Sequence, residues 1–367
     1  MSVTTALTIK SQEPLNAGTP VATLGQDFIT PSEQFFIRSH GNIPAVNPAS
    51  YHLTVDGLVD QPLSLTLAEL QARFTPVEVT ATLQCAGNRR AELHTIKPIN
   101  GEVQWDIDGI STGVWTGFRL ADLLGEAGLR LQSDTNHVLF DGLDTVEREG
   151  HSFGYGGSIP LVKALNPEVL LAYKLNGQPL TAEHGFPLRV VVPGYIGARS
   201  VKWLNHIRVA EQPSTNFFQT KAYKLFPPQV SAAEADWLKA EALGAVRINS
   251  VITNPLPDAV LPANQPFTIE GYAIGAENTS VASVEVSLDE GQAWQSTELV
   301  TPCRDPWTWQ LWKITLTLPP GNYGLVVRAA DSANNRQPAD FGAVWNFKGY
   351  MNNAWQRINI NVRMPTA

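Results

Sequence analysis

From Ile248 onward the chain consists of short segments in which apolar and polar residues alternate. The clearest of these segments are 267–272, 281–288, 309–318 and 322–329. Gly, Asn and Pro residues, which are typical of turns, separate them. Alternation with a period of two gives a strand one buried face, and short strands at regular spacing are typical of an antiparallel sandwich. We therefore predict an immunoglobulin-like β-sandwich over 241–367.

The first 240 residues have a different pattern, in which strand-like and helix-like segments alternate. The predicted elements are short helices over 67–73 and 120–127, the first with Thr66 as its N-cap, and a buried strand over 188–192. Residues 1–30 are polar and rich in Thr and Gln, which predicts an N-terminal arm. We place the boundary near residue 240, in or just after a helix-like stretch over 232–243. The predicted fold class is α+β, with a mixed α/β domain over 1–240 followed by the sandwich.

Composition excludes several classes of function. The 367 residues carry a net charge of −8, which argues against general nucleic-acid binding. Residues 1–10 lack a signal-peptide pattern, and no apolar run approaches the ~18 residues of a membrane helix. We expect no nucleic-acid or membrane partner and a cytoplasmic protein, or a periplasmic one where an export signal has been removed. Cys85 and Cys303 do not make a disulfide framework, and we assign Cys303 no role.

Cys85 stands in the segment richest in reactive side chains. Residues 77–83 alternate like a half-buried strand, so Cys85 falls at a strand end, before a small-residue turn and the pair Arg89 and Arg90. Neighbouring positive charges stabilise a thiolate, and the thiolate is the form that binds soft transition metals. The same arginines suit an anionic substrate. The alternative is a small buried core residue beside a surface arginine pair.

The segment 83–90, Leu-Gln-Cys-Ala-Gly-Asn-Arg-Arg, resembles the molybdenum-ligand motif of the sulfite oxidase family. Other segments of the chain also match motifs of this family. One lies before the cysteine segment, Phe-Phe-Ile-Arg-Ser-His at 35–40. The others lie after it: Trp105 with Gly-Ile-Ser-Thr at 109–112, His-Gly-Phe-Pro-Leu-Arg at 184–189, then 190–194, 197–204, Tyr-Lys at 223–224, and Trp345 to Trp355. They extend over nearly the whole chain. The resemblance implies a molybdopterin domain followed by an immunoglobulin-like dimerisation domain, and therefore a homodimer.

The resemblance also implies one molybdenum–molybdopterin cofactor per chain, with Cys85 as the metal ligand. The positions that match cofactor-binding residues are Phe36, Ile37, Arg38, Ser39, His40, Asp144, His184, Arg189, Ser200, Val201 and Lys202. Cations and backbone amides suit the phosphate and the polar pterin of such a cofactor. Taken alone, His184 also fits a core histidine and Lys202 a surface lysine. Because Phe35 stands so near the start of the sequence, we expect no haem on this chain and an external electron acceptor such as a c-type cytochrome.

For the reaction, the resemblance implies molybdenum-dependent oxidation of sulfite to sulfate. The positions that match the substrate pocket of the family are Arg38, Arg90, Trp105, Tyr223 and Lys348. Arginine suits a small dianion because its planar guanidinium donates two parallel hydrogen bonds. Lys348 stands where sulfite oxidases carry arginine. Lysine keeps the positive charge but lacks the planar guanidinium with its two parallel hydrogen-bond donors.

Two alternatives stay open. Lys348 and the following Met351, Asn352 and Asn353 also favour another molybdenum-dependent oxygen-atom-transfer enzyme, such as a nitrate reductase or a sulfoxide reductase. A non-enzymatic dimeric binding protein would keep the scaffold without the metal, although the presence of Cys85 argues against it.

Two cofactor-binding positions depart from the family pattern. Ser39 replaces the usual asparagine, and Ser200 replaces the histidine of the animal enzymes. Both serines keep a hydrogen-bonding group, so we expect cofactor binding to be retained.

Overall fold

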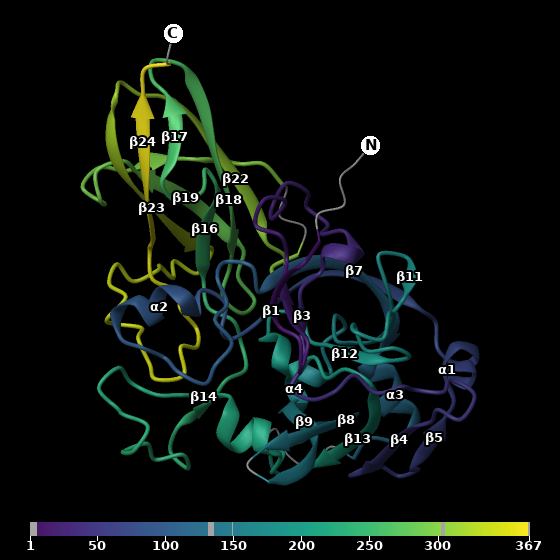
Figure 1. The fold of residues 1–367 in the computed structure, drawn as a ribbon. Helices are drawn as coiled ribbons and strands as arrows, with labels where there is room; N and C mark the ends of the chain where they lie inside the picture. Colours follow the sequence, from purple (N-terminus) through teal and green to yellow (C-terminus); the bar gives the residue numbers. More distant parts are fainter. Residues whose placement is uncertain (1–5, 131–135, 149, 302–304, 366–367) are drawn as a thin grey trace.

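We describe the protein from a computed structural model, which covers residues 6–130, 136–148, 150–301 and 305–365. Figure 1 shows a broad first part, coloured from purple to green, and an elongated sandwich that carries the C-terminus at its tip. Cys303 lies outside the described residues. Among the described residues, none of the helices has the length and the apolar character that a membrane span requires.

Two sheets form the frame of the first part, one antiparallel and one mixed, in which β13 pairs with β4 in parallel, while the helices are short. One sheet has the order β11 (Gln178–Pro179), β10 (Leu170–Leu175), β7 (Ile110–Arg119), β6 (Val77–Gln84), and β12 (Arg189–Val191) also pairs with β10. A second has the order β5 (Leu63–Leu65), β4 (Leu53–Gly57), β13 (Leu204–Ala210), β8 (His137–Arg148), β9 (His151–Pro160). The helices are α1 (Leu67–Arg73), α2 (Arg90–Ile96), α3 (Leu120–Glu126) and α4 (Leu161–Ala164), with one-turn helices η1 (Ser32–Gln34), η2 (Gly197–Arg199) and η3 (Phe218–Ala222).

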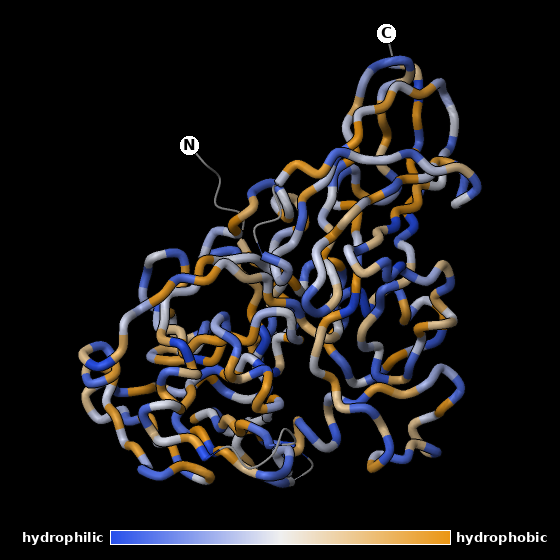
Figure 2. Tube along the Cα trace, turned by 180° about the vertical axis from the view of Figure 1, so that it is seen from behind, coloured by the Kyte–Doolittle hydropathy of each residue, from blue (hydrophilic) through white to orange (hydrophobic). Residues whose placement is uncertain are grey.

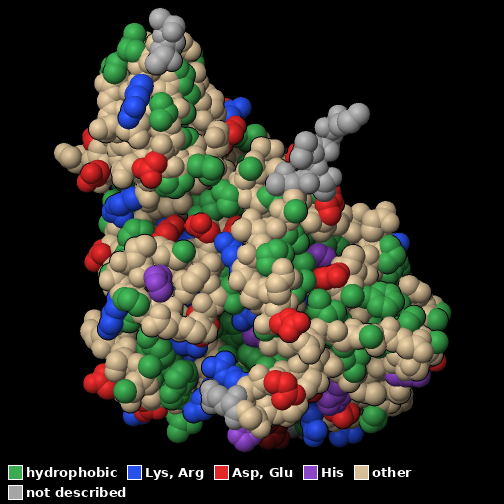
Figure 3. All heavy atoms as spheres, viewed as in Figure 1, with side chains coloured by type: hydrophobic (Ala, Val, Ile, Leu, Met, Phe, Trp, Pro, Cys, Tyr) green, Lys and Arg blue, Asp and Glu red, His purple; other side chains and the backbone are tan. Residues whose placement is uncertain are grey.

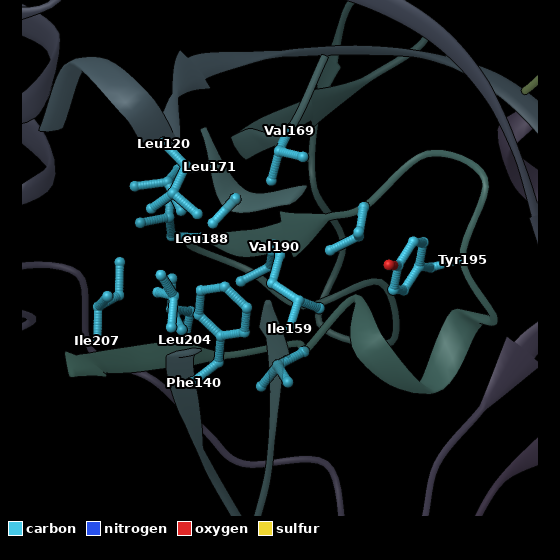
Figure 4. Packing of buried hydrophobic residues seen from close by; sticks show 14 of the residues in the cluster. Leu120, Phe140, Ile159, Val169, Leu171, Leu188, Val190, Tyr195, Leu204 and Ile207 are labelled. Atoms are coloured by element: carbon cyan, nitrogen blue, oxygen red, sulfur yellow. The ribbon is translucent and has the colours of Figure 1, made fainter. Parts of the chain in front are cut away.

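The core of the first part lies between these sheets. Figure 4 shows side chains of β8, β12 and β13 pointing toward one another, among them Phe140, Val190 and Ile207, each of which is fully buried. Burying side chains of this size stabilises a fold by roughly 1.5–3 kcal/mol each. The strand predicted over 188–192 is therefore confirmed as β12 in the middle of this core.

Both predicted helices are present, and the first begins where its sequence requires. The backbone N–H of Glu69 donates to the hydroxyl of Thr66, and the carboxylate of Glu69 accepts from the backbone N–H of Thr66, which completes a capping box before α1. The second predicted helix corresponds to α3.

The second part is the predicted sandwich. One sheet has the order β16 (Asn249–Asn254), β18 (Pro266–Ile274), β22 (Gln310–Thr317), β21 (Glu298–Leu299), and the other β17 (Ala259–Pro262), β24 (Gln356–Arg363), β23 (Gly321–Asp331), β19 (Val281–Ser287), β20 (Gln295–Ser296). The four strands expected from the sequence are β18, β19, β22 and β23. Apolar and polar stretches follow one another closely along the chain here (Figure 2), and the inward residues, such as Ile269, Val284 and Ile360, form a separate core.

The helix-like stretch over 232–243 is not a helix. It forms turns that end in β15 (Glu241–Ala242), which pairs with β14 (Lys224–Leu225). Trp237 packs edge-on against Phe226 and Phe347, while Leu238 is 94% exposed. Tertiary packing of one aromatic ring therefore outweighs the helical spacing of the apolar residues.

The N-terminal arm is partly ordered as a sheet. Strand β1 (Thr8–Ser11) pairs with β2 (Asn16–Gly18), and β2 pairs with β3 (Ile37–Arg38). Lys10 forms an ion pair of 2.8 Å with Asp108, whose side chain is fully buried. In Figure 1 the labels of β1 and β3 stand near the centre of the molecule, and β3 itself belongs to the predicted site segment 36–40.

Candidate active site

Cys85 lies in a turn whose geometry is fixed from several sides. It directly follows β6, and its backbone N–H donates to the carbonyl of Gly109 at 2.8 Å. The backbone N–H of Asn88 in turn donates to the carbonyl of Cys85 at 3.0 Å. A Cβ at Gly87 would collide with the guanidinium of Arg90, so a larger residue there would displace this side chain. The thiol is unpaired with another cysteine and the residue is only 5% exposed.

A pocket beside Cys85 gathers most of the predicted site residues. The predicted residues that line it are Phe36, Ile37, Arg38, Ser39, His40, Cys85, Asp144, His184, Arg189, Ser200, Lys202 and Tyr223. Figure 3 shows a hollow near the centre of this face of the molecule, with lysine and arginine side chains around it.

Buried cations dominate one side of the pocket. The ammonium of Lys202 donates to the hydroxyl of Ser39 at 3.0 Å, and Arg189 donates to the carbonyls of His184 and Ser200, each at 3.0 Å. Burial lowers the pKa of Arg189 to about 9, and burial together with the charge of Arg189 lowers the pKa of Lys202 well below its usual range. Because burial disfavours the charged forms of Arg189 and Lys202, an anionic ligand such as a phosphate would stabilise these charged forms.

Arg38 connects these cations with Cys85. Its guanidinium donates to the side-chain carbonyl of Asn16 at 3.1 Å, and the same Asn16 oxygen accepts from the backbone N–H of Ser39 at 3.1 Å. Burial lowers the pKa of Arg38, but the negative charges that Tyr223 and Cys85 can carry outweigh this effect and leave it raised. Arg38 is therefore held as a cation that faces both the thiol and the tyrosine.

His40 and Tyr223 form a buried pair. The ring nitrogen Nε2 of His40 lies 2.7 Å from the hydroxyl of Tyr223, and the His40 ring stacks on Tyr155 at 4.7 Å. Burial, followed by the charges of Arg38 and Lys202, lowers the pKa of His40 well below 6.5, and burial raises the pKa of Tyr223 to about 12. At neutral pH the histidine is therefore neutral and the tyrosine keeps its proton.

Asp144 offers an acceptor that the described residues do not satisfy. Its carboxyl is buried, and the oxygen Oδ1 has no hydrogen-bond partner among the described residues. Burial raises the pKa of Asp144 to about 6 despite the nearby charge of Lys202. A ligand with N–H donors, such as a pterin, would satisfy this oxygen. The buried thiol, the cations and this acceptor together fit an anionic pterin cofactor that carries a metal.

We expect Asp144→Asn to stabilise the cofactor-free protein more at pH 8 than at pH 5. Because the folded-state pKa of about 6 lies above the ordinary 3.8, the folded state binds the proton more tightly, and the free energy of unfolding falls as pH rises through this window. Asparagine carries no charge at either pH, so the extra gain at pH 8 should be about 1.4 kcal/mol. Thermal unfolding at both pH values measures this gain.

The control for this experiment is Asp27→Asn, because the side chain of Asp27 is exposed. It should change the unfolding midpoint equally at the two pH values. An equal effect of Asp144→Asn at pH 5 and pH 8 would show that the carboxyl is not held in its protonated form.

Four predicted residues do not line the pocket. Val201 is part of the apolar core and contributes its carbonyl to the backbone N–H of Val190 at 2.8 Å. Trp105 is fully buried in the same cluster as Cys85, and its indole N–H has no partner among the described residues. Arg90 and Lys348 lie further back and are both engaged with Glu102.

Arg89, the other arginine of the cysteine segment, joins the two parts of the molecule. It is fully buried with a positive φ of 65°, and its guanidinium donates to Asn249 at 2.6 Å and to the carbonyl of Ala354 at 2.8 Å. Its charge is paired with Glu92 at 2.6 Å. The two adjacent arginines therefore differ in role. Arg89 connects the two parts of the molecule, whereas Arg90 contacts Glu102 near the site.

Asn16 and Glu102 are site residues that the sequence analysis missed. Asn16 belongs to a segment that reads as a polar arm, and Glu102 belongs to a polar loop before Trp105. The only available signal was the position of Glu102 close to the Trp105 motif. Their contacts with Arg38 and Lys348 join residues that are 22 and 246 positions apart, and no local pattern predicts such pairs.

Comparisons with known proteins agree with this site. Residues 40–218 match the oxidoreductase molybdopterin binding domain family, and residues 240–363 match the Mo-co oxidoreductase dimerisation domain family. The chain is 43% identical over 359 residues to sulfite oxidase of Gallus gallus, covering 96% of this chain and 77% of that protein. The chain belongs to the sulfite oxidase family. Its resemblance to this family and the predicted α+β fold class are both confirmed.

Other members of the sulfite oxidase family extend the comparison. The chain is 41% identical to mitochondrial sulfite oxidase of Mus musculus, covering 97% of this chain and 66% of that protein, so it spans about two thirds of the mammalian relative. The crystal structure of the sulfane dehydrogenase SoxCD from Paracoccus pantotrophus superposes with a TM-score of 0.79 at 26% identity. That superposition covers 100% of this chain and 90% of the SoxCD chain.

Proposed function

We propose that this protein oxidises sulfite to sulfate with one molybdenum–molybdopterin per chain and passes the electrons to an external acceptor such as a c-type cytochrome. The observation that carries the proposal is the placement of a buried free thiol, Cys85, and a half-buried cation, Arg38, in one pocket. Membership in the sulfite oxidase family supports the same substrate and cofactor.

The proposed reaction sets clear tasks for the residues of the pocket. Sulfite takes up one oxygen atom from water and releases two electrons and two protons as it becomes sulfate. The cofactor supplies the two-electron redox chemistry when it is bound. The thiolate of Cys85 holds the metal, because soft metals prefer sulfur ligands. Lys202 and Arg189 would hold the phosphate, and Asp144 would accept hydrogen bonds from the pterin.

Substrate binding falls to the residues near Arg38. Its guanidinium presents two donors to the sulfite oxygens, and its orientation is fixed by Asn16. Tyr223 keeps its proton at neutral pH and donates a hydrogen bond to a substrate or product oxygen. His40 contacts the Tyr223 hydroxyl and so positions it. We further propose that the protein acts as a homodimer through residues 240–363, and that it works in the cytoplasm or, if exported, in the periplasm.

Metal analysis combined with a turnover assay tests the proposal. The protein is purified from a host that makes the cofactor, its molybdenum content is measured, and sulfite-dependent reduction of ferricyanide is followed. We expect about one molybdenum per chain and sulfite-dependent turnover. Bound molybdenum without sulfite turnover would redirect the search to another oxygen-atom acceptor or donor, such as nitrate or a sulfoxide. A protein without molybdenum would refute the proposal.

A further inference from the structure

Glu102 forms an ion pair that connects the two parts of the molecule at the active site. Its carboxylate accepts a short hydrogen bond from the ammonium of Lys348. The two side chains are only 14% and 13% exposed, so water screens the pair weakly. Lys348 is the position at which sulfite oxidases carry arginine, and here its charge is directed at a carboxylate of the same chain.

Arg90 completes this cluster. Its Nη2 lies 4.0 Å from the second oxygen of Glu102, while its Nε and Nη1 donate to the carbonyls of Lys348 at 3.0 Å and Val103 at 2.5 Å. The same guanidinium packs 5.0 Å above the ring of Tyr350. Arg90 therefore contacts the carboxylate of Glu102 and the backbone of Lys348. The three charged groups together carry a single positive charge.

Of the three residues in this cluster, Glu102 lies next to the pocket. A second cavity is lined by Glu102 together with Arg38 and His40, which also line the pocket beside Cys85. The charge of Glu102 acts on the pocket itself, since it contributes to raising the pKa of both Arg38 and Tyr223. An anion in this second cavity lies beside both Arg38 and the carboxylate of Glu102.

We propose that Glu102 is an internal counter-ion that competes with the oxyanion for Arg90 and Lys348 and so sets the affinity of the site. A small oxyanion and the carboxylate present the same chemistry to these cations, which is negatively charged oxygen at hydrogen-bonding distance. The carboxylate keeps both cations in place, and the oxyanion must displace it or share its partners. The choice of sulfite as substrate rests on the proposed function, whereas competition for oxyanions in general does not.

The test measures sulfate binding to the purified, cofactor-loaded protein by titration calorimetry. The amide of Glu102→Gln keeps the size and a hydrogen bond to Lys348 but removes the charge. We expect its Kd for sulfate to fall at least about fivefold, with a parallel fall of the KM for sulfite. The matched control is Glu147→Gln, since Glu147 lines the same cavity but forms no ion pair with Arg90 or Lys348 among the described contacts. It should change the Kd less than about twofold.

A double variant identifies the cation through which Glu102 acts. In Glu102→Gln/Lys348→Met the gain in sulfate affinity should disappear, because the released ammonium is no longer present. Unchanged or weaker sulfate binding by Glu102→Gln, with an unchanged thermal unfolding midpoint, would overturn the proposal and leave Glu102 a structural partner. Tighter sulfate binding without sulfite turnover in the wild type would keep this inference while the proposed function fails.

Discussion

Replacing the thiol of Cys85 with a hydroxyl is expected to abolish sulfite oxidation while the fold is kept. Cys85→Ser replaces a single atom, the sulfur, in a residue that is 5% exposed. The backbone of this residue is held by hydrogen bonds to Gly109 and Asn88. A serine oxygen is a hard and normally protonated ligand, so it does not replace a thiolate on a soft metal. We expect kcat to fall at least about 10³-fold, which corresponds to roughly 4 kcal/mol of transition-state stabilisation.

The matched control uses the other cysteine of the chain. Cys303→Ser makes the same chemical change and should leave turnover and molybdenum content at wild-type values. Thermal unfolding of both variants shows whether the fold is intact. If Cys85→Ser oxidised sulfite within about tenfold of the wild type, the thiolate would not be the essential metal ligand.

The parts of the fold that follow local rules were predictable. The capping box of Thr66 and Glu69 determines where α1 begins, because it depends on residues three positions apart. Alternation of apolar and polar residues identified β18 and β23 as strands, although residues 271–274 and 325–327 are buried on both faces. The prediction of a helix-like stretch over 232–243 was wrong, because Trp237 packs against residues that are distant in sequence.

The candidate site divides in the same way. The segment around Cys85 and the segment 36–40 were recognisable from their residues, and the pocket brings them together. The electrostatic partners were not predictable, since the carboxylate that engages Lys348 belongs to a loop 246 positions earlier. A sequence motif therefore predicts which cations are present, but only the fold determines which of them face a ligand and which face a carboxylate.

Removal of the guanidinium at position 38 is expected to have the largest effect on the substrate side. Arg38→Met keeps an unbranched side chain of similar length but removes the guanidinium from the pocket that contains Cys85. Losing a charged hydrogen-bond partner of a bound anion costs 2–5 kcal/mol in comparable buried pairs, so we expect kcat/KM for sulfite to fall about 10²–10³-fold. The loss should appear mainly in KM, because Arg38 binds the anion in the ground state as well as in the transition state.

Two companion variants separate the charge of Arg38 from its orientation. Arg38→Lys keeps the charge without the planar fork, so it should restore only part of kcat/KM. Asn16→Ala leaves the guanidinium in place but removes the oxygen that it contacts at 3.1 Å, and its KM for sulfite should lie between those of the wild type and Arg38→Met. Steady-state kinetics at constant molybdenum content measures all three variants. Equal activity of Arg38→Met and the wild type would move the anion site away from Arg38 and toward the cations around Glu102.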